Sequence, residues 1–95
     1  MSESLLPDDL AQLAARVVAA NREAGRTLAL AESCTGGLVA AALTEIAGSS
    51  AVLDRGFVTY SNESKHELLG VSNEMIETFG AVSIACAWSM AQGAL

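Results

Sequence analysis

The sequence predicts a layered α/β fold, most simply a right-handed βαβ unit with helices covering a parallel sheet. Short apolar runs typical of buried strands alternate along the chain with segments that have the spacing of helices. Such alternation indicates α/β architecture. Hydrophobic residues make up 52% of the chain but aromatic residues only 4%. We therefore expect one small domain, residues 1–95, whose thin core consists of closely packed aliphatic side chains.

The N-terminal segment predicts a helix from residue 8 to residue 24. Pro7 stands near the first helical position, and Asp8 and Asp9 place carboxylates in the first turn, where the helix dipole favours them. Apolar side chains then follow at helical spacing. Gly25 suits the left-handed conformation in which many helices end.

Two short runs predict strands. Residues 27–31 fit a strand buried on both faces, and residues 57–60 are rich in aromatic and β-branched side chains. A helix over residues 38–48 separates them, and further helices are expected through residue 69, near residues 74–79 and from about residue 83. Because two strands alone make a poor sheet, we expect the domain to continue beyond Leu95 or to take strands from a partner chain.

The charge balance and the apolar runs limit what the chain can bind. Five Lys and Arg residues stand against 11 Asp and Glu residues, and the net charge of −6 has the wrong sign for attraction to nucleic acid. The longest apolar run, Leu38–Leu43, has six residues, whereas a membrane span needs roughly 20. The acidic start MSESLLPDD carries no targeting signal. We expect a soluble cytoplasmic protein that binds neither nucleic acid nor membrane.

The two cysteines predict free thiols. Cys34 and Cys86 have no C-x-x-C spacing, and a disulfide between them is unfavourable in a reducing compartment. No cluster of His, Cys and carboxylate residues at ligand spacing predicts a metal site.

The stretch AESCTGG, residues 31–37, is the first candidate site. It follows a predicted strand and precedes a helix, so it should lie at the carboxyl edge of the sheet, where open α/β folds bind ligands. Ser33 or Thr35 can cap the helix, while Gly36 and Gly37 bring backbone N–H groups to a helix start that attracts anions. The stretch matches neither of the glycine-rich nucleotide-binding patterns. A helix cap without any ligand explains the same residues.

The second candidate cluster, which contains Tyr60, Asn62 and Lys65, follows the second predicted strand. With Asn62 as N-cap, Lys65 would take the third helical position, where the helix dipole opposes its charge. Such a lysine could act as a general base, and a solvated surface lysine is the simpler interpretation. If the strands are parallel neighbours, their carboxyl ends bring Ser33 and Lys65 to one edge, as a Ser–Lys pair requires.

Cys34 and His66 form a rival pair, because an imidazole can activate a thiolate. In an extended segment Ser33 and Cys34 would point to opposite sides, so at most one of them should face a cleft. A Cys34 buried behind the loop and a surface His66 are the simpler interpretations. Glu32 is either an orienting carboxylate in the site or a surface residue that ends the strand.

The last predicted helix carries Ile84, Trp88 and Leu95 at spacings that could place them on one face. Packing in the core is the simpler explanation. An oligomer contact is the alternative, because a thin domain has little else to cover an apolar face.

The two clusters together resemble the CinA C-terminal domain family, the nicotinamide-nucleotide amidases. The motifs that carry the resemblance are AESCTGG at residues 31–37, FVTYSNESK at 57–65, LLGV at 68–71, GAVS at 80–83 and MAQGA at 90–94. They cover nearly the whole chain in one order.

The resemblance implies an α/β/α layered domain with a mostly parallel central sheet, of which this chain would hold the N-terminal part. It implies hydrolysis of the carboxamide of nicotinamide mononucleotide to nicotinate mononucleotide and ammonia, with no metal or cofactor. By position, Ser33 would be the nucleophile and Lys65 its proton acceptor, and the glycine turn would face the oxyanion or the substrate phosphate. The other implied site residues are Tyr60 as a catalytic hydroxyl and Glu32, Thr35, Gly36, Gly37 and Asn62 around the substrate.

Two departures from the family pattern raise an alternative. The family domain continues beyond residues 90–94 with further strands and a T-G-x-x-G-P type loop, and the usually charged turn after Ser83 is apolar here. The alternative function is a truncated, noncatalytic domain that binds the nucleotide or serves in dimerisation, and we expect a homo-oligomer. A DNA-linked competence role, which the family's name suggests, finds no basic patch in the sequence.

Overall fold

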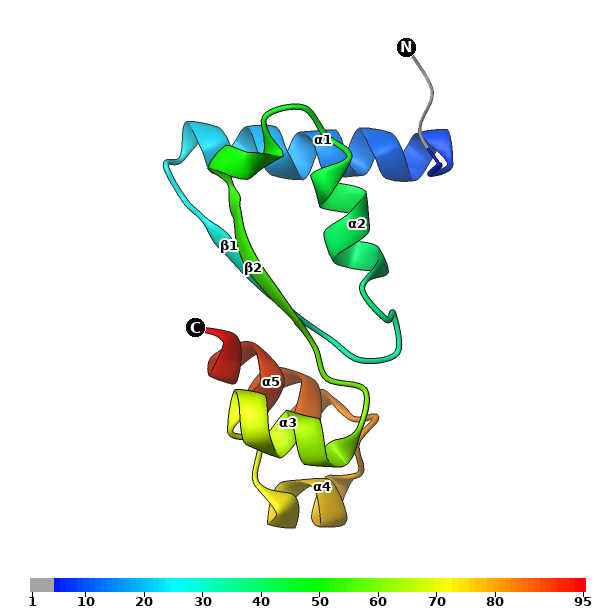
Figure 1. Ribbon diagram of the computed structural model, residues 1–95, viewed down its shortest axis with the longest axis vertical. Coiled ribbons are helices and arrows are strands. Elements are labelled where there is room, and N and C mark those ends of the chain that lie inside the picture. Colours follow the sequence, from blue (N-terminus) through cyan, green and yellow to red (C-terminus); the bar gives the residue numbers. More distant parts are fainter. Residues whose placement is uncertain (1–4) are drawn as a thin grey trace. The chain divides into compact units, whose positions relative to one another are not determined.

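A computed structural model describes residues 5–95, and Figure 1 shows its elements. In chain order these are α1 (Asp8–Glu23), β1 (Leu28–Glu32), α2 (Leu38–Thr44), the 3-10 helix η1 (Ser49–Ala51), β2 (Leu53–Val58), α3 (Asn62–Leu69), α4 (Asn73–Phe79) and α5 (Ile84–Ala94). The predicted order of helices and strands is confirmed. None of the helices between residues 5 and 95 is long and apolar enough to cross a lipid bilayer.

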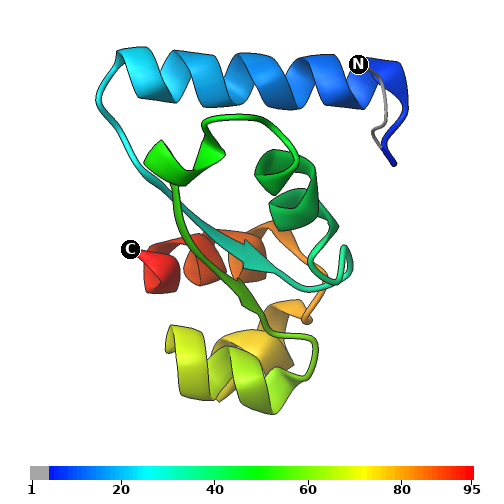
Figure 2. The same cartoon turned by 45° about the horizontal axis from the view of Figure 1, so that its top comes forward.

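The two strands pair in parallel. The backbone N–H of Leu28 donates to the carbonyl of Val52 at 2.8 Å near one end, and that of Thr59 donates to the carbonyl of Glu32 at 2.8 Å near the other. Figure 2 shows both arrows running in the same direction. The α/β class is confirmed. The expected burial of the first strand is wrong, because in a two-stranded sheet each strand is an edge, and of β1 only Glu32 is buried.

The second strand lies earlier in the chain than the sequence predicts. It covers Leu53–Val58 rather than residues 57–60, and it includes the polar run Asp54-Arg55-Gly56. Pairing with β1 holds these residues in an extended conformation, which overrides their low strand propensity. Thr59 and Tyr60 consequently follow the strand and lead into α3.

The chain forms two compact units, and each strand passes from the first into the second. The first unit consists of Met1–Ala29 and Leu38–Arg55. Its helix α1 packs against α2, and the side chains buried in this unit include Ala14, Val18 and Leu43. Gly25 has a φ of 67°, the left-handed conformation that the sequence predicts after α1.

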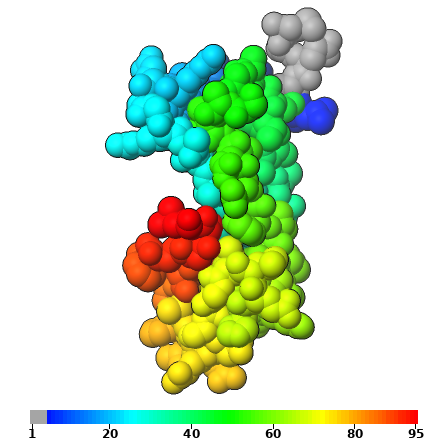
Figure 3. Space-filling view, turned by 60° about the vertical axis from the view of Figure 1, so that its left-hand side comes forward, coloured from blue at the N-terminus to red at the C-terminus, as the bar shows by residue number. Residues whose placement is uncertain are grey.

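The second unit consists of Leu30–Gly37 and Gly56–Leu95. Its helices α3, α4 and α5 pack against one another, and Figure 3 shows α5, in orange and red, directly against α3, in yellow-green. Cys86, Met90 and Ala94 form the buried stripe of α5 at a spacing of four residues.

Serine side chains cap all three helices of the second unit. Ser61, Ser72 and Ser83 each accept the backbone N–H three residues further on, at 3.0, 3.0 and 3.1 Å. The prediction of Asn62 as N-cap is therefore wrong. Asn62 is the first residue of α3, and Lys65 is the fourth rather than the third.

The outer face of α5 is apolar and exposed. Ile84 is 91% exposed, Trp88 64% and Leu95 97%, so the predicted packing of these residues in the core is wrong. The opposite stripe of the same helix provides the core contacts instead. The oligomer contact stays a prediction.

Candidate active site

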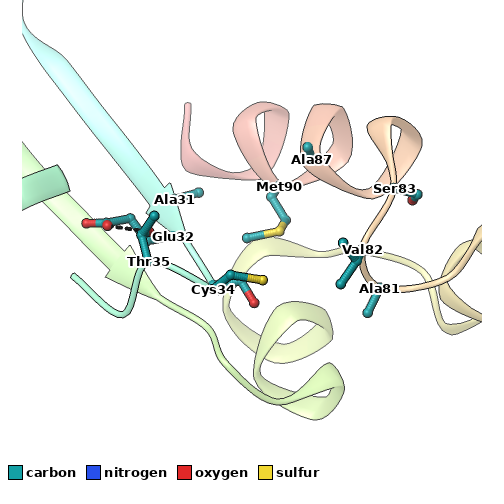
Figure 4. A pocket seen from close by; sticks show the side chains of 10 residues that line it. Ala31, Glu32, Cys34, Thr35, Ala81, Val82, Ser83, Ala87 and Met90 are labelled. Atoms are coloured by element: carbon teal, nitrogen blue, oxygen red, sulfur yellow. Dashed lines mark hydrogen bonds between the residues drawn. The ribbon is translucent and has the colours of Figure 1, made fainter. Parts of the chain in front are cut away.

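A cavity of about 240 Å³ lies within the second unit (Figure 4). Residues 31–35, which are the end of β1 and the turn that follows it, form one wall. The opposite wall comes from the turn before α5 and from α5 itself, and consists of Ala81, Val82, Ser83, Ala87 and Met90. The first five residues of AESCTGG thus lie at the cavity.

Glu32 is a buried carboxylate in the cavity wall, with 5% of its surface exposed. Its Oε1 accepts a hydrogen bond of 2.6 Å from the hydroxyl of Thr35, and Figure 4 shows the two side chains together. This short hydrogen bond connects the turn to the end of β1. The interpretation of Glu32 as a surface residue is wrong.

Five residues, 33–37, separate β1 from α2, so neither Ser33 nor Thr35 directly precedes the helix and caps it as predicted. The turn needs positive backbone angles, which Gly36 (φ 61°) and Gly37 (φ 103°) provide. The N–H of Gly36 donates to the carbonyl of Ser33 at 3.0 Å. This N–H is therefore engaged in the turn rather than open to an anion at the helix start.

Both candidate nucleophiles line the cavity. Ser33 is half-buried, and Cys34 is exposed and is a free thiol, as is the buried Cys86. The expectation that at most one of the two residues faces a cleft is wrong, because the chain bends at Ser33 instead of staying extended. A buried Cys34 is also wrong. Figure 4 shows Met90 extending from α5 toward Cys34.

His66 lies on the surface, as the simpler interpretation predicts. Its Nδ1 lies 2.8 Å from the carbonyl oxygen of Val71. Since a carbonyl only accepts, this nitrogen carries the proton. His66 does not line the cavity that Cys34 lines, so the geometry gives no support to a Cys34–His66 pair.

Lys65 is 1% exposed, so its interpretation as a solvated surface lysine is wrong. Its Nζ donates to the carbonyls of Thr59 at 2.8 Å and Tyr60 at 3.0 Å. These carbonyls offset the loss of water around a buried amine. The N–H of Thr59 also donates to the carbonyl of Glu32 on the neighbouring strand, so the two backbones lie one strand spacing, about 4.8 Å, apart. Glu32 directly precedes Ser33. The two clusters meet at one sheet edge, although Lys65 itself does not line the cavity.

The remaining predicted site residues lie outside the cavity walls. The side chain of Tyr60 is 75% exposed, and the contribution of this residue to the cluster is its backbone carbonyl. Asn62 is exposed at the start of α3. Gly36 and Gly37 shape the turn behind Cys34.

Sequence reasoning missed the wall that α5 and its preceding turn provide. The motifs GAVS and MAQGA contributed to the resemblance, but Ala, Val and Met carry no group that marks a site. The one polar member is Ser83, whose hydroxyl donates to the carbonyl of Gly80 at 2.8 Å while it caps α5. The sequence feature that could have indicated this wall is the run of small residues in GAVS, directly before the helix predicted from about residue 83.

A comparison with protein families matches residues 10–95 to the CinA C-terminal domain. The chain belongs to the CinA C-terminal domain family. The family resemblance read from the motifs is thereby confirmed. The same α/β domain occurs in the crystal structure of the competence/damage inducible protein CihA from Agrobacterium tumefaciens, with a TM-score of 0.94 and 58% identity; the match covers 97% of this chain and 56% of that one.

Relatives within the CinA C-terminal domain family include enzymes by name. The nicotinamide-nucleotide amidohydrolase PncC of Enterobacter agglomerans is 56% identical over 86 residues, which are 90% of this chain and 52% of that protein. PncC of Escherichia coli K12 is 52% identical over 87 residues, 92% of this chain and 53% of the relative. The chain thus spans about half the length of these curated relatives.

Proposed function

We propose that this domain takes part in hydrolysis of the carboxamide of nicotinamide mononucleotide, which yields nicotinate mononucleotide and ammonia. The names of the relatives support the amidohydrolase class. The observation that carries the proposal for this chain is the position of Ser33. Ser33 lines the cavity and directly follows Glu32, the last residue of β1. The carbonyl of Glu32 accepts the N–H of Thr59, and the carbonyl of Thr59 in turn accepts a hydrogen bond from Lys65.

In the first step, Ser33 Oγ attacks the carboxamide carbon and forms a tetrahedral intermediate. The C–N bond then breaks, ammonia leaves, and an ester joins the acyl group to Ser33. We assign the proton transfer to Lys65, which takes the hydroxyl proton and returns it to the leaving nitrogen. Two of the positions around its Nζ point at carbonyls, and one tetrahedral position is left to take up or release that proton.

In the second step, water attacks the ester and releases the carboxylate product. Lys65 serves again as proton acceptor for this water. Glu32 and Thr35 are proposed to bind the substrate from the cavity wall, and their mutual hydrogen bond supports a fixed orientation. The proposed roles of Tyr60, Asn62, Gly36 and Gly37 at the substrate stay predictions. The reaction as written uses no metal or cofactor.

Ammonia release from nicotinamide mononucleotide tests the proposal, with Ser33→Ala and Cys34→Ala as a matched pair on one cavity wall. We expect Ser33→Ala to lose activity by about 10³-fold or more, since no other group would form the ester. Cys34→Ala should keep most of the activity. Turnover that survives Ser33→Ala would remove the serine assignment, and loss in Cys34→Ala alone would transfer the role to the thiol.

The competing function is a noncatalytic domain that binds the nucleotide or serves in dimerisation. The match covers about half the length of the enzymes that the chain resembles, so the activity of those whole enzymes has to be tested for this chain rather than assumed. Calorimetric titration separates the two. Binding of the mononucleotide without ammonia release favours the binding domain, and ammonia release at an enzymatic rate excludes it.

A further inference from the structure

We infer that the hydroxyl of Thr59 carries the proton between Ser33 and Lys65. The inference rests on the proposed function, because it adds a member to the same reaction. Two observations carry it: Thr59 lies beside both of these residues, and its hydroxyl is buried without a partner.

The hydroxyl of Thr59 does not serve the packing of the fold. Thr59 is 0% exposed, and its Oγ1 has no hydrogen-bond partner among the residues that the structure describes. A buried hydroxyl without a partner lowers stability, and valine would fill the same space without that cost. A residue of this kind calls for an explanation in the chemistry of the site.

The backbone places Thr59 next to Ser33, since each is the first residue after its strand. In parallel strands, an N–H donates to the carbonyl of the residue that precedes its cross-strand neighbour. Because the N–H of Thr59 donates to the carbonyl of Glu32 at 2.8 Å, that neighbour is Ser33. Neighbours in a parallel pair lie about 4.8 Å apart, with their side chains on the same face.

The preceding pair of residues supports this assignment of faces. Glu32 bonds Thr35 in the turn after β1. A Cβ atom on Gly37, in the same turn, would lie 3.5 Å from Cγ2 of Val58. The side chains of Glu32 and Val58 therefore share the face that meets the turn, and the two hydroxyl residues that follow them share the other face.

Lys65 approaches Thr59 from α3. Its Nζ donates to the carbonyl of Thr59 at 2.8 Å. Ser33 lines the cavity, whereas neither Thr59 nor Lys65 does, and Lys65 is 1% exposed. A proton that leaves Ser33 must therefore pass into the protein to reach the amine, and Thr59 adjoins both residues.

In the first step, Ser33 Oγ forms its bond to the carboxamide carbon, the carbonyl electron pair moves to oxygen, and the serine proton passes to Thr59 Oγ1. Thr59 gives its own hydroxyl proton to the unprotonated amine of Lys65. The threonine ends neutral and the lysine carries the positive charge. When the C–N bond breaks, the path runs in reverse and the proton joins the leaving nitrogen. Catalytic hydrogen bonds are often long until substrate is bound, and they shorten in the complex.

Thr59→Val and Thr59→Ser separate the hydroxyl from the packing, and both keep the backbone bonds of residue 59. We expect Thr59→Val to raise the Tm by about 4 °C or more, since it removes a buried hydroxyl without a partner. Thr59→Ser should lower the Tm, because it leaves a small cavity in place of a methyl group. Thr78→Val, at an exposed position of α4, is the control and should change the Tm little.

The rate at which Ser33 reacts with diisopropyl fluorophosphate measures its activation without any nicotinamide substrate. Ser33 Oγ bonds to phosphorus, fluoride leaves, and the serine proton passes through Thr59 to Lys65. We expect Thr59→Val to slow this reaction at least tenfold, whereas Thr59→Ser and Thr78→Val stay within about threefold of the unchanged chain. Mass spectrometry of the peptide that contains residues 31–37 locates the adduct. A purely structural role of Thr59 would not give a slower reaction in a more stable variant.

Four results would overturn the inference: no adduct on Ser33 in the unchanged chain, an unchanged rate in Thr59→Val, an equal loss of rate in Thr59→Ser, or a slower reaction of Thr59→Val together with a lower Tm. Failure of the proposed function gives a different pattern. In that case the reaction with diisopropyl fluorophosphate still depends on the Thr59 hydroxyl, while nicotinamide mononucleotide releases no ammonia. That pattern supports the proton path and removes the proposed substrate.

Discussion

At the scale of single residues, the buried amine of Lys65 is part of the hydrogen-bond chain that connects its own cluster to the AESCTGG turn. Its Nζ donates to the carbonyls of Thr59 and Tyr60, and Thr59 is bonded through its N–H to Glu32. Lys65 therefore has two roles: it stabilises the backbone next to the cavity, and in the proposed reaction it transfers the proton. Its two roles can be separated by measuring stability and activity on the same variants.

We expect Lys65→Met to lower the free energy of unfolding by about 1–3 kcal/mol, because the buried carbonyl of Thr59 loses its donor. Ammonia release should be lost as well. Chemical denaturation and the ammonia assay measure the two effects. Lys65→Arg is the control, since it keeps a donor and should recover part of the stability without the proton transfer. A Met variant as stable as the parent chain would contradict the structural role.

The hydrogen bond between Thr35 and Glu32 should stabilise the turn. We expect Thr35→Val to lower the free energy of unfolding by about 1.5–3 kcal/mol, because a buried carboxylate loses a short hydrogen bond. Thr44→Val is the matched control. The hydroxyl of Thr44 bonds a carbonyl of its own helix at an exposed position, and its loss should cost less than about 0.5 kcal/mol. Equal losses in the two variants would contradict the importance of the Glu32 contact.

The sequence predicted one wall of the cavity and not the other. Ser33, Thr35 and Glu32 stand together in the chain and carry reactive or hydrogen-bonding groups, so their motif marked the site. Met90 and Ala87 carry neither, and they line the cavity because α5 forms the wall opposite residues 31–35. The burial of Lys65 was also missed, because the carbonyls that bind it come from the backbone and have no sequence signature.

At the scale of elements, the packing of α3 against α5 depends on Gly93. A Cβ atom at this position would lie 2.7 Å from the carbonyl carbon of Leu69 and 2.9 Å from its Cα, and closer still to its carbonyl oxygen. Backbone atoms cannot move aside as a flexible side chain can. The two helices can approach this closely only while residue 93 has no side chain.

We expect Gly93→Ala to lower the free energy of unfolding by about 1–3 kcal/mol, since the helices must separate to admit the methyl group. Helix propensity alone predicts the opposite sign, a gain of about 1 kcal/mol. Gln92→Ala, on the exposed side of the same helix, is the control and should have little effect. A stabilised Gly93→Ala variant in chemical denaturation would contradict the close helix contact.

The serine caps offer a second test at this scale. Ser72 caps α4 away from the cavity, and its hydroxyl accepts the N–H of Met75 at 3.0 Å. We expect Ser72→Ala to lower the free energy of unfolding by about 1 kcal/mol and Ser72→Asp to keep most of the stability, because aspartate is also a good cap. Ammonia release should be the same in all three chains. A loss of stability with Ser72→Asp equal to that with Ser72→Ala would contradict the capping role.

Most helices and strands could be predicted from the spacing of apolar residues and from the residues that typically start or end a helix. The helix at Asp8–Glu23 has its acidic first turn and its glycine stop, and both were visible. The position of β2 was not visible, because Asp54, Arg55 and Gly56 take extended conformations only through pairing with β1. The helix predicted over residues 38–48 starts at Leu38 as expected but ends earlier, at Thr44, and the 3-10 helix η1 follows at Ser49–Ala51.

At the scale of the whole molecule, the candidate chemistry belongs to the second unit. The cavity, Ser33 and Lys65 all lie within Leu30–Gly37 and Gly56–Leu95. The chain spans about half the length of the curated relatives in its family. Whether this half suffices for catalysis is therefore the question on which the proposed function depends, and detection of the covalent intermediate answers it for the residues concerned.

The most direct test mixes the full chain with nicotinamide mononucleotide, quenches the mixture rapidly in acid and locates any covalent adduct by mass spectrometry of the peptide that contains residues 31–37. We predict an acyl group from the mononucleotide on Ser33, formed together with ammonia and absent from Ser33→Ala. An adduct on Cys34, or ammonia released by Ser33→Ala at the rate of the unchanged chain, would contradict the assignment of Ser33 as the nucleophile.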